Sequence, residues 1–232
     1  MPSLVTIVLA TNNAHKVTEI RAILGGQFRF LTLADFPGAP KVTEDAPTFA
    51  GNAAKKAIAL ARFVSEIRHP ELPAFALADD SGLEVDTLNG APGVYSARFA
   101  ALDKGTEGNS SDADNRAKLL RLLQNIPPEK RSARFRCVVA LTPMTELANE
   151  NASPVCYADE LDMGTELFEG TCEGEIGFSE KGQGGFGYDS LFIPKGYSQT
   201  FGELTEEVKN RISHRAQALA KLQVRFKDAS LL

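Results

Sequence analysis

Three carboxylates early in the chain, Glu44, Asp79 and Asp80, could carry out chemistry together. Phe75–Ala78 is a short apolar run that favours a buried strand, so Asp80 is expected on the turn that leads to Ser81-Gly82. Carboxylates at a strand end can bind Mg²⁺ by one or two contacts while substrate phosphates and waters complete the octahedron. One carboxylate could also deprotonate an attacking water. The alternative is a plain turn, since Asp-Ser-Gly is a favoured turn composition.

The opening loop, Thr11-Asn12-Asn13-Ala14-His15-Lys16, carries polar and basic residues. Val5–Ala10 before it is typical of a buried strand, and Lys16–Leu24 after it has helical periodicity up to Gly25-Gly26. The loop therefore leads to a helix N-terminus, where backbone amides and the helix dipole favour an anion such as phosphate. Lys16 adds a positive charge. The alternative is an ordinary capped helix start.

Further basic residues could also meet an anion. Lys56 lies in a predicted helix that Asn52 caps and that runs to about Ile67. It is close enough to the start of this helix to face the same cleft as the opening loop. The alternative is that Lys56 lies on a solvated helix face. His214 and Arg215 directly follow Ser213, the expected cap of the last helix. A cation at a helix N-terminus opposes the helix dipole, which indicates a functional role that a bound anion would explain.

The segment Gly182–Asp189 combines glycines with Phe186, Tyr188 and Asp189. Glycine allows the backbone to approach a ligand closely, Phe186 could stack on a base, and Asp189 could orient the loop. The alternative is a glycine-rich turn with Phe186 in the core. Gln183 stands where a P-loop requires Lys, so that motif is excluded.

The elements that would position these residues alternate between strands and helices early in the chain, while strands cluster later. This order favours a mixed α/β sheet protein, and the length predicts one large domain or two intimate lobes. The other expected elements are a helix over 112–125 with Leu119, Leu120, Leu122 and Leu123 facing inward, a flexible loop over 101–111, strands near 135–141 and 191–193, an extended segment over 166–176, an irregular insertion over 142–163, and a last helix with Ala216, Leu219, Ala220 and Phe226 on its inner side.

The charge balance excludes one class of partner. The chain of 232 residues has 30 acidic and 25 basic residues and a net charge of −5, whereas proteins that coat nucleic acid usually have a basic excess. A small anionic ligand remains possible. Cys137, Cys156 and Cys172 form no C-x-x-C pair, so a zinc or redox site is unsupported. Neither a signal peptide nor a long apolar run is visible, which favours a cytoplasmic protein away from the membrane.

Five ordered motifs resemble those of the inosine triphosphate pyrophosphatase family, the Ham1-like proteins. They are Thr11-Asn12-Asn13-x-x-Lys16; Thr48-Phe49-x-x-Asn52-Ala53-x-x-Lys56-Ala57; Asp79-Asp80-Ser81-Gly82-Leu83-x-Val85 with Gly90–Phe99; Gly184-Gly185-Phe186-Gly187-Tyr188-Asp189; and Ile212-Ser213-His214-Arg215-x-Gln217-Ala218. The matches extend from residue 5 to about 222.

The resemblance implies a single α/β domain over residues 1–232, with a mixed long central sheet flanked by helices and a cleft between two lobes. It also implies a homodimer that uses Mg²⁺ to hydrolyse inosine, deoxyinosine and xanthosine triphosphates to the monophosphate and pyrophosphate. Asp80 is implied as catalytic carboxylate and metal ligand, Glu44 as the other metal ligand, and Lys56 as a catalytic residue. Positions that match substrate-binding ones are Thr11, Asn12, Asn13, Ala14, His15, Lys16, Ser81, Arg98, Phe186, Gly187, Tyr188, Asp189, Lys209, His214 and Arg215.

Two residues depart from the family pattern: Gly51 stands where a Glu is usual, and Thr43 stands where a second acid often precedes the ligand Glu. Two other functions stay open. One is a Maf-like nucleotide pyrophosphatase of other base specificity, against which the His214-Arg215 pair and the Gly185–Asp189 loop argue. The other is a nucleotide-binding regulator that does not hydrolyse, against which Glu44, Lys56 and Asp80 argue.

Overall fold

The computed structural model describes residues 4–67, 73–105, 108–144 and 164–228. Its strands are β1 (Val5–Leu9), β2 (Phe28–Thr32), β3 (Phe75–Val85), β4 (Ser132–Pro143), β5 (Glu166–Ile176) and β6 (Phe192–Pro194). Its α-helices are α1 (Ala14–Leu24), α2 (Phe49–Glu66), α3 (Ala101–Lys104), α4 (Asp112–Leu123), α5 (Glu206–Ile212) and α6 (His214–Asp228). A 3₁₀ helix, Gly93–Arg98, lies between β3 and α3.

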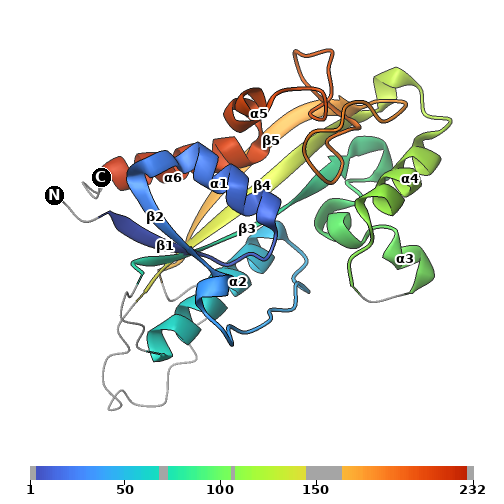
Figure 1. The fold of residues 1–232 in the computed structure, drawn as a ribbon. Coiled ribbons are helices and arrows are strands. Elements are labelled where there is room, and N and C mark those ends of the chain that lie inside the picture. Colours follow the sequence, from blue (N-terminus) through green and yellow to red (C-terminus); the bar gives the residue numbers. More distant parts are fainter. Residues whose placement is uncertain (1–3, 68–72, 106–107, 145–163, 229–232) are drawn as a thin grey trace. The chain divides into compact units, whose positions relative to one another are not determined.

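The strands form one six-stranded sheet in the order β2-β1-β3-β4-β5-β6. β1 is parallel to both β2 and β3, whereas β5 and β6 are antiparallel. The sheet is therefore mixed, and helices flank it (Figure 1). This confirms the predicted fold class, a mixed α/β sheet protein.

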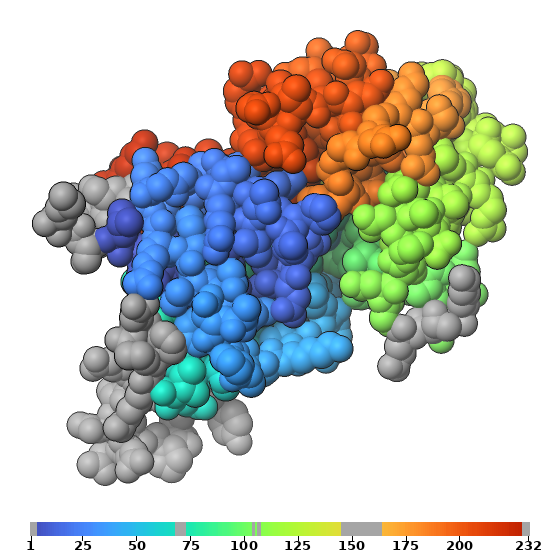
Figure 2. Space-filling model, in the orientation of Figure 1, coloured from blue at the N-terminus to red at the C-terminus, as the bar shows by residue number. Residues whose placement is uncertain are grey.

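The chain divides into two compact units. The first comprises residues 1–80, 138–168 and 219–232, and the second comprises residues 81–137 and 169–218. In the first unit, α1 lies on one side of the strands with the end of α6, and α2 lies on the other side (Figure 1). The blue N-terminal segments form the face of this unit that the space-filling view shows (Figure 2).

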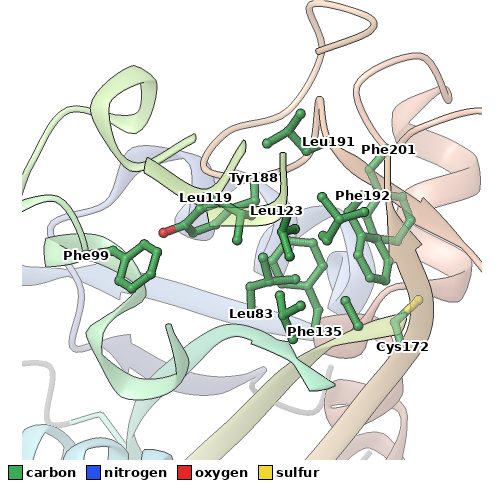
Figure 3. Packing of buried hydrophobic residues seen from close by; sticks show 13 residues of the cluster. Leu83, Phe99, Leu119, Leu123, Phe135, Cys172, Tyr188, Leu191, Phe192 and Phe201 are labelled. Carbon is green, nitrogen blue, oxygen red and sulfur yellow. The ribbon is translucent and has the colours of Figure 1, made fainter. Parts of the chain in front are cut away.

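The core of the second unit gathers side chains from β3, α4, β4, β5 and β6 and from the loops beside them, as Figure 3 shows. Phe135 of β4 packs against Phe192 with ring centroids 4.7 Å apart, and Leu119 and Leu123 of α4 are fully buried in the same cluster. Gly170 of β5 lies so close to α6 that an added Cβ would be 2.0 Å from the carbonyl oxygen of His214. This glycine lets the helix start approach the strand without interrupting it.

Two predictions about the elements around the acidic residues are wrong. Thr48, not Asn52, is the N-cap of α2, because the Thr48 hydroxyl accepts the Gly51 N–H; Asn52 is buried inside the helix. Asp80 does not lie on a turn, since β3 continues through Asp79-Asp80-Ser81-Gly82 to Val85. Partners from neighbouring elements satisfy the polar side chains, so turn composition does not end the strand.

Smaller corrections concern helix faces and one loop. The segment predicted as a flexible loop begins with α3, Ala101–Lys104. Leu122 is 41% exposed although it was predicted to face inward. Ala220 is also exposed, and Ala218 is buried in its place. Most of the predicted insertion, residues 145–163, lies outside the described residues, while Thr142 and Pro143 belong to β4. In the part of the chain that the structure describes, no helix has the length and apolar character needed to cross a membrane.

Candidate active site

Strand β3 presents Asp79 and Asp80 to the two faces of the sheet, because successive side chains of a strand point in opposite directions. The side chain of Asp79 is fully buried and pairs with Lys16 of α1, whose Nζ lies 3.1 Å from Oδ2. The carboxylate of Asp80 meets residues of α2 instead. One dipeptide therefore connects the helices on both sides of the first unit.

The Asp80 carboxylate lies in a network of polar side chains. Asn52 donates from Nδ2 to Asp80 Oδ2 at 3.0 Å, and Lys56 Nζ lies 3.7 Å from Asp80 Oδ1. Lys56 also donates to Glu44 Oε2 at 3.0 Å and to the carbonyl oxygen of Asp79 at 2.8 Å. The structure thus brings together three residues that the sequence predicts for one site, Glu44, Lys56 and Asp80.

Burial and charge oppose each other in this network. Burial raises the pKa of Asp80 above its ordinary value, although Lys56, Lys16 and the hydrogen bond from Asn52 favour the ionised form. Burial would lower the pKa of Lys56, but Asp80, Glu44 and Asp79 outweigh it, so that pKa lies above its ordinary value. Lys56 therefore stays charged at neutral pH, and the Asp80 carboxylate is more easily protonated than an exposed one.

The opening loop forms a capped helix start, as the simpler interpretation of the sequence had it. Asn13 Oδ1 accepts the backbone N–H groups of His15 and Lys16 at 2.9 and 3.3 Å, and Thr11 Oγ1 accepts the Asn13 N–H at 3.1 Å. These amides are therefore occupied. The ammonium group of Lys16, which reaches Asp79, is the charge that this loop offers to an anion.

The donor set fits a divalent cation that also binds phosphate. Two carboxylates, those of Glu44 and Asp80, face the same ammonium group of Lys56. Across the described residues, no three His, Cys, Asp or Glu side chains gather as a metal site of their own. Mg²⁺ is usually bound through one or two carboxylates while substrate phosphates and waters supply the other ligands, so a pair of carboxylates matches its needs.

In the second unit, the glycine-rich loop presents Phe186 beside cations. Asp189 Oδ2 accepts the Phe186 N–H at 2.8 Å and the Lys209 ammonium group of α5 at 2.6 Å. Lys209 Nζ also lies 4.7 Å from the centroid of the half-buried Phe186 ring. Asp189 thus orients the loop, as the sequence suggested, and Lys209 fixes both the carboxylate and the ring.

The buried residues His214 and Arg215 begin α6. Arg215 donates from Nη2 to Ser81 Oγ at 3.0 Å, and its guanidinium carbon lies 6.0 Å from the centroid of the Phe186 ring. His214 stacks on Phe135 with ring centroids 4.8 Å apart. The structure therefore groups Ser81, Phe186, Asp189, Lys209 and Arg215 within the second unit.

Two further predicted binding residues, Tyr188 and Arg98, have contacts of their own within the second unit. Tyr188 is buried among the cluster residues (Figure 3), and its hydroxyl donates to the Ser96 carbonyl oxygen at 2.9 Å. Burial holds the pKa of Tyr188 above its ordinary value, so the group stays neutral. Arg98, in the 3₁₀ helix, places its guanidinium group 5.0 Å from the ring centroid of the exposed Tyr95.

One residue of the first unit, Asn52, was missed as a member of the site. Asn52 was read as a helix cap, yet its amide donates to Asp80 and its Oδ1 accepts the Ala46 N–H at 2.9 Å. Asp79 was expected among the three carboxylates, and its partner in the structure is Lys16. A polar residue predicted on the buried face of an amphipathic helix was the available signal for Asn52, because buried polar groups need partners.

Around β3 the first unit holds paired charges suited to phosphate oxygens and a cation, and the second unit holds a loop with an aromatic ring beside cations. These features belong to a mixed α/β protein with charged and aromatic side chains gathered within its two units. The sequence profile of the Ham1 family matches residues 7–225, and the chain belongs to this family. The resemblance inferred from the five motifs is thus confirmed.

Relatives and solved structures are similar to this chain along nearly its whole length. A dITP/XTP pyrophosphatase of Desulforamulus reducens is 48% identical over 216 residues, which cover 93% of this chain and 92% of the relative. A dITP/XTP pyrophosphatase of Geobacillus kaustophilus is 43% identical, covering 96% and 94%. The structure of a HAM1 protein from Coxiella burnetii superposes with a TM-score of 0.75 at 34% identity, covering 97% of this chain and 100% of that one.

Proposed function

We propose that this protein hydrolyses noncanonical purine nucleoside triphosphates, namely inosine, deoxyinosine and xanthosine triphosphates, to the monophosphate and pyrophosphate, and thereby clears them from the nucleotide pool. The observation that carries the proposal is the buried Asp80, held by Asn52 and Lys56 beside Glu44. Relatives at up to 48% identity carry the name dITP/XTP pyrophosphatase, which supports the same reaction.

Lys16 and Lys56 bind and orient the triphosphate in this proposal, because both ammonium groups lie at the Asp79-Asp80 dipeptide. Thr11, Asn12, Asn13, Ala14 and His15 are proposed to line the phosphates from the opening loop. Asp80 accepts the proton of the attacking water at one carboxylate oxygen, while the hydrogen bond from Asn52 holds the other. Lys56 then offsets negative charge that develops on the phosphate.

Mg²⁺ is the proposed cofactor, with Glu44 and Asp80 as its protein ligands. When bound it would supply positive charge at the reacting phosphate. Two observations support this assignment: both carboxylates are held at one cation, and both are hard oxygen donors.

The base is proposed to bind at the loop of the second unit. Phe186 stacks on the purine, with Gly187, Tyr188 and Asp189 shaping the segment. Lys209, His214, Arg215, Ser81 and Arg98 are proposed to contact the base and the rest of the substrate. A site that pairs with a 6-keto group rejects a 6-amino group strongly, because the mismatch leaves buried polar groups unpaired.

The proposal extends to the location, the oligomeric state and the form of the substrate. We propose a cytoplasmic homodimer whose substrate is a free nucleotide rather than a nucleic acid polymer or a membrane component. The net charge of −5 supports the free nucleotide, since it would repel polymeric phosphate from the surface at large. Analytical ultracentrifugation at micromolar concentrations would test the dimer, and a sedimenting monomer would contradict it.

The function is tested by measuring pyrophosphate release from a panel of eight nucleoside triphosphates, both common and deaminated, with and without Mg²⁺. We expect turnover of inosine, deoxyinosine and xanthosine triphosphates in the presence of Mg²⁺. Equal hydrolysis of adenosine and inosine triphosphates would contradict the proposed selectivity. Preferred hydrolysis of a pyrimidine substrate would favour a Maf-like specificity, and binding without turnover would favour a regulator.

A further inference from the structure

The loop that carries Phe186 is held from outside the proposed site by helix α4. The N–H group of Gly187 donates to Asp112 Oδ2 at 2.7 Å, and the carbonyl oxygen of the same residue accepts from Arg116 Nη1 at 2.9 Å. Both polar groups of one backbone residue are thus bound by two side chains of one helix. Gly187 directly follows the aromatic residue that we propose stacks on the base.

The helix geometry explains why these two residues can act together. Asp112 is the first residue of α4, after the N-cap Ser111, and Arg116 follows it by four positions. Residues four apart lie on the same face of a helix, so both side chains project toward the loop. A carboxylate in the first helical turn also interacts favourably with the helix dipole, which fixes its place.

Arg116 is itself held in position. Its Nε donates to Glu180 Oε2 at 2.8 Å, and Ser190 Oγ donates to the same oxygen at 3.3 Å. Glu180 and Ser190 precede and follow the glycine-rich segment, so Arg116 connects both of its ends to the carbonyl group of Gly187. The Arg116 side chain is 19% exposed, whereas that of its partner Glu180 is 43% exposed.

We propose that Asp112 and Arg116 are positioning residues for the base: they fix the Gly187 backbone and thereby hold the Phe186 ring in its stacking position. This inference rests on the proposed function. Neither residue needs to touch the substrate. Their loss would let the peptide after Phe186 rotate, so part of the binding free energy would be spent on ordering the loop.

The test compares variants of the full chain in steady-state pyrophosphate release with inosine triphosphate. Arg116→Leu and Asp112→Ala remove one contact each, and Asp112→Asn keeps an oxygen that can accept the Gly187 N–H. For each of the first two we expect KM to rise about fivefold to tenfold, as when one charge-assisted hydrogen bond is lost, at nearly unchanged kcat. Asp112→Asn should recover most of the loss.

Two controls separate positioning from general damage. Inorganic tripolyphosphate has no base, so its inhibition constant should stay within about twofold of the parent value in every variant. Arg121→Gln is the matched helix control, because Arg121 lies on α4 but pairs with Asp103 instead of the loop; its KM should equal that of the parent. In the Asp112→Ala variant, the Gly187 amide should exchange with deuterium faster.

The outcomes distinguish the inference from the function on which it rests. Unchanged KM in both variants, or tripolyphosphate inhibition that weakens as much as KM rises, overturns the positioning role. A parent enzyme that releases no pyrophosphate from inosine triphosphate overturns the proposed function instead. If Arg116→Leu fails to fold, the pair of substitutions at Asp112 decides alone, since that side chain is exposed at the end of its helix.

Discussion

The two groups of candidate site residues are built in opposite ways. In the first unit, charged side chains project from regular helices and a strand and pair with one another, Lys16 with Asp79 and Lys56 with Asp80. In the second unit, Phe186 and Gly187 lie on an irregular loop whose backbone is bound by surrounding side chains. The arrangement of the first group depends on the positions of charged side chains. The arrangement of the second group depends on the backbone conformation of the loop.

This difference predicts different consequences of substitution. A change among the charged residues alters the groups that we propose bind the phosphates, so it should lower kcat. A change in the loop or its supports alters the preorganisation of the aromatic ring, so it should raise KM while kcat stays. Four substitutions test this division, beginning with the largest expected effect.

Asp80→Asn should remove the general base while keeping the size of the side chain. We expect kcat for inosine triphosphate to fall by about 10²–10⁴, the usual contribution of a positioned base, with a small change in KM. Stopped-flow or steady-state pyrophosphate release measures both. Near-normal turnover would remove Asp80 from its proposed role and with it the chemical character of the first group.

Asn52→Leu tests whether the charged group needs a neutral support. Asn52 connects the Ala46 N–H to Asp80 Oδ2 inside the first unit. We expect kcat to fall about tenfold to a hundredfold, as when partners that orient a functional carboxylate are lost, and the free energy of unfolding to drop by about 1–3 kcal/mol.

Asn115 provides the control for this substitution. It is likewise a buried asparagine, but its Oδ1 accepts the Ala100 N–H in the second unit. Urea unfolding of Asn115→Leu should show a similar loss of stability without the same loss of kcat. If both variants lose kcat equally, the effect of Asn52 is one of general stability.

From the sequence, the charged residues could be identified more readily than the elements that position them could be predicted. Lys56, Glu44 and Asp80 stood out by type and motif, and the structure brings them together. Yet the strand through Asp79 and Asp80 was taken for a turn, because local composition ignores the partners that Lys16 and α2 supply across the sheet.

The elements missed in the sequence share a physical cause. β2 (Phe28–Thr32) is short, and its membership of the sheet comes from parallel pairing with β1. α5 (Glu206–Ile212) has seven residues, too few to show a clear periodicity, although Thr205 caps it and two acids follow. Such elements are stabilised by tertiary contacts that a local pattern does not contain.

Gly185→Ala tests the backbone dependence of the second group. Gly185 has φ +73°, and an added Cβ would lie 2.1 Å from Asp189 Oδ2, the atom that binds Lys209 and the Phe186 N–H. We expect a KM increase of about tenfold or more with a smaller change in kcat, because strain of about 1–3 kcal/mol and a displaced carboxylate both disturb the loop.

Gly196→Ala is the matched control, because Gly196 has φ +88° but its added Cβ would meet no atom within 4 Å. That variant should lose stability through backbone strain alone and keep the parent KM. Measured KM and urea midpoints for both variants decide the comparison: equal KM values in the two variants would mean that the close approach to Asp189 is irrelevant to substrate binding.

Lys16→Met should have the smallest effect, and it sharpens the electrostatic side of the comparison. Burial already raises the pKa of Asp80, while Lys56 and Lys16 lower it. Removing the Lys16 charge disfavours the ionised carboxylate, so the pKa of Asp80 should move further up. Carboxyl ¹³C NMR of the metal-free protein would follow the titration directly, and the acid limb of kcat/KM should shift to higher pH in the same direction.

Lys55→Met is the matched control, since Lys55 pairs with Asp45 at 2.7 Å and is absent from the causes that shift the pKa of Asp80. A titration of Asp80 that moves equally in both variants would show that net charge, and not the placement of Lys16, governs this carboxylate.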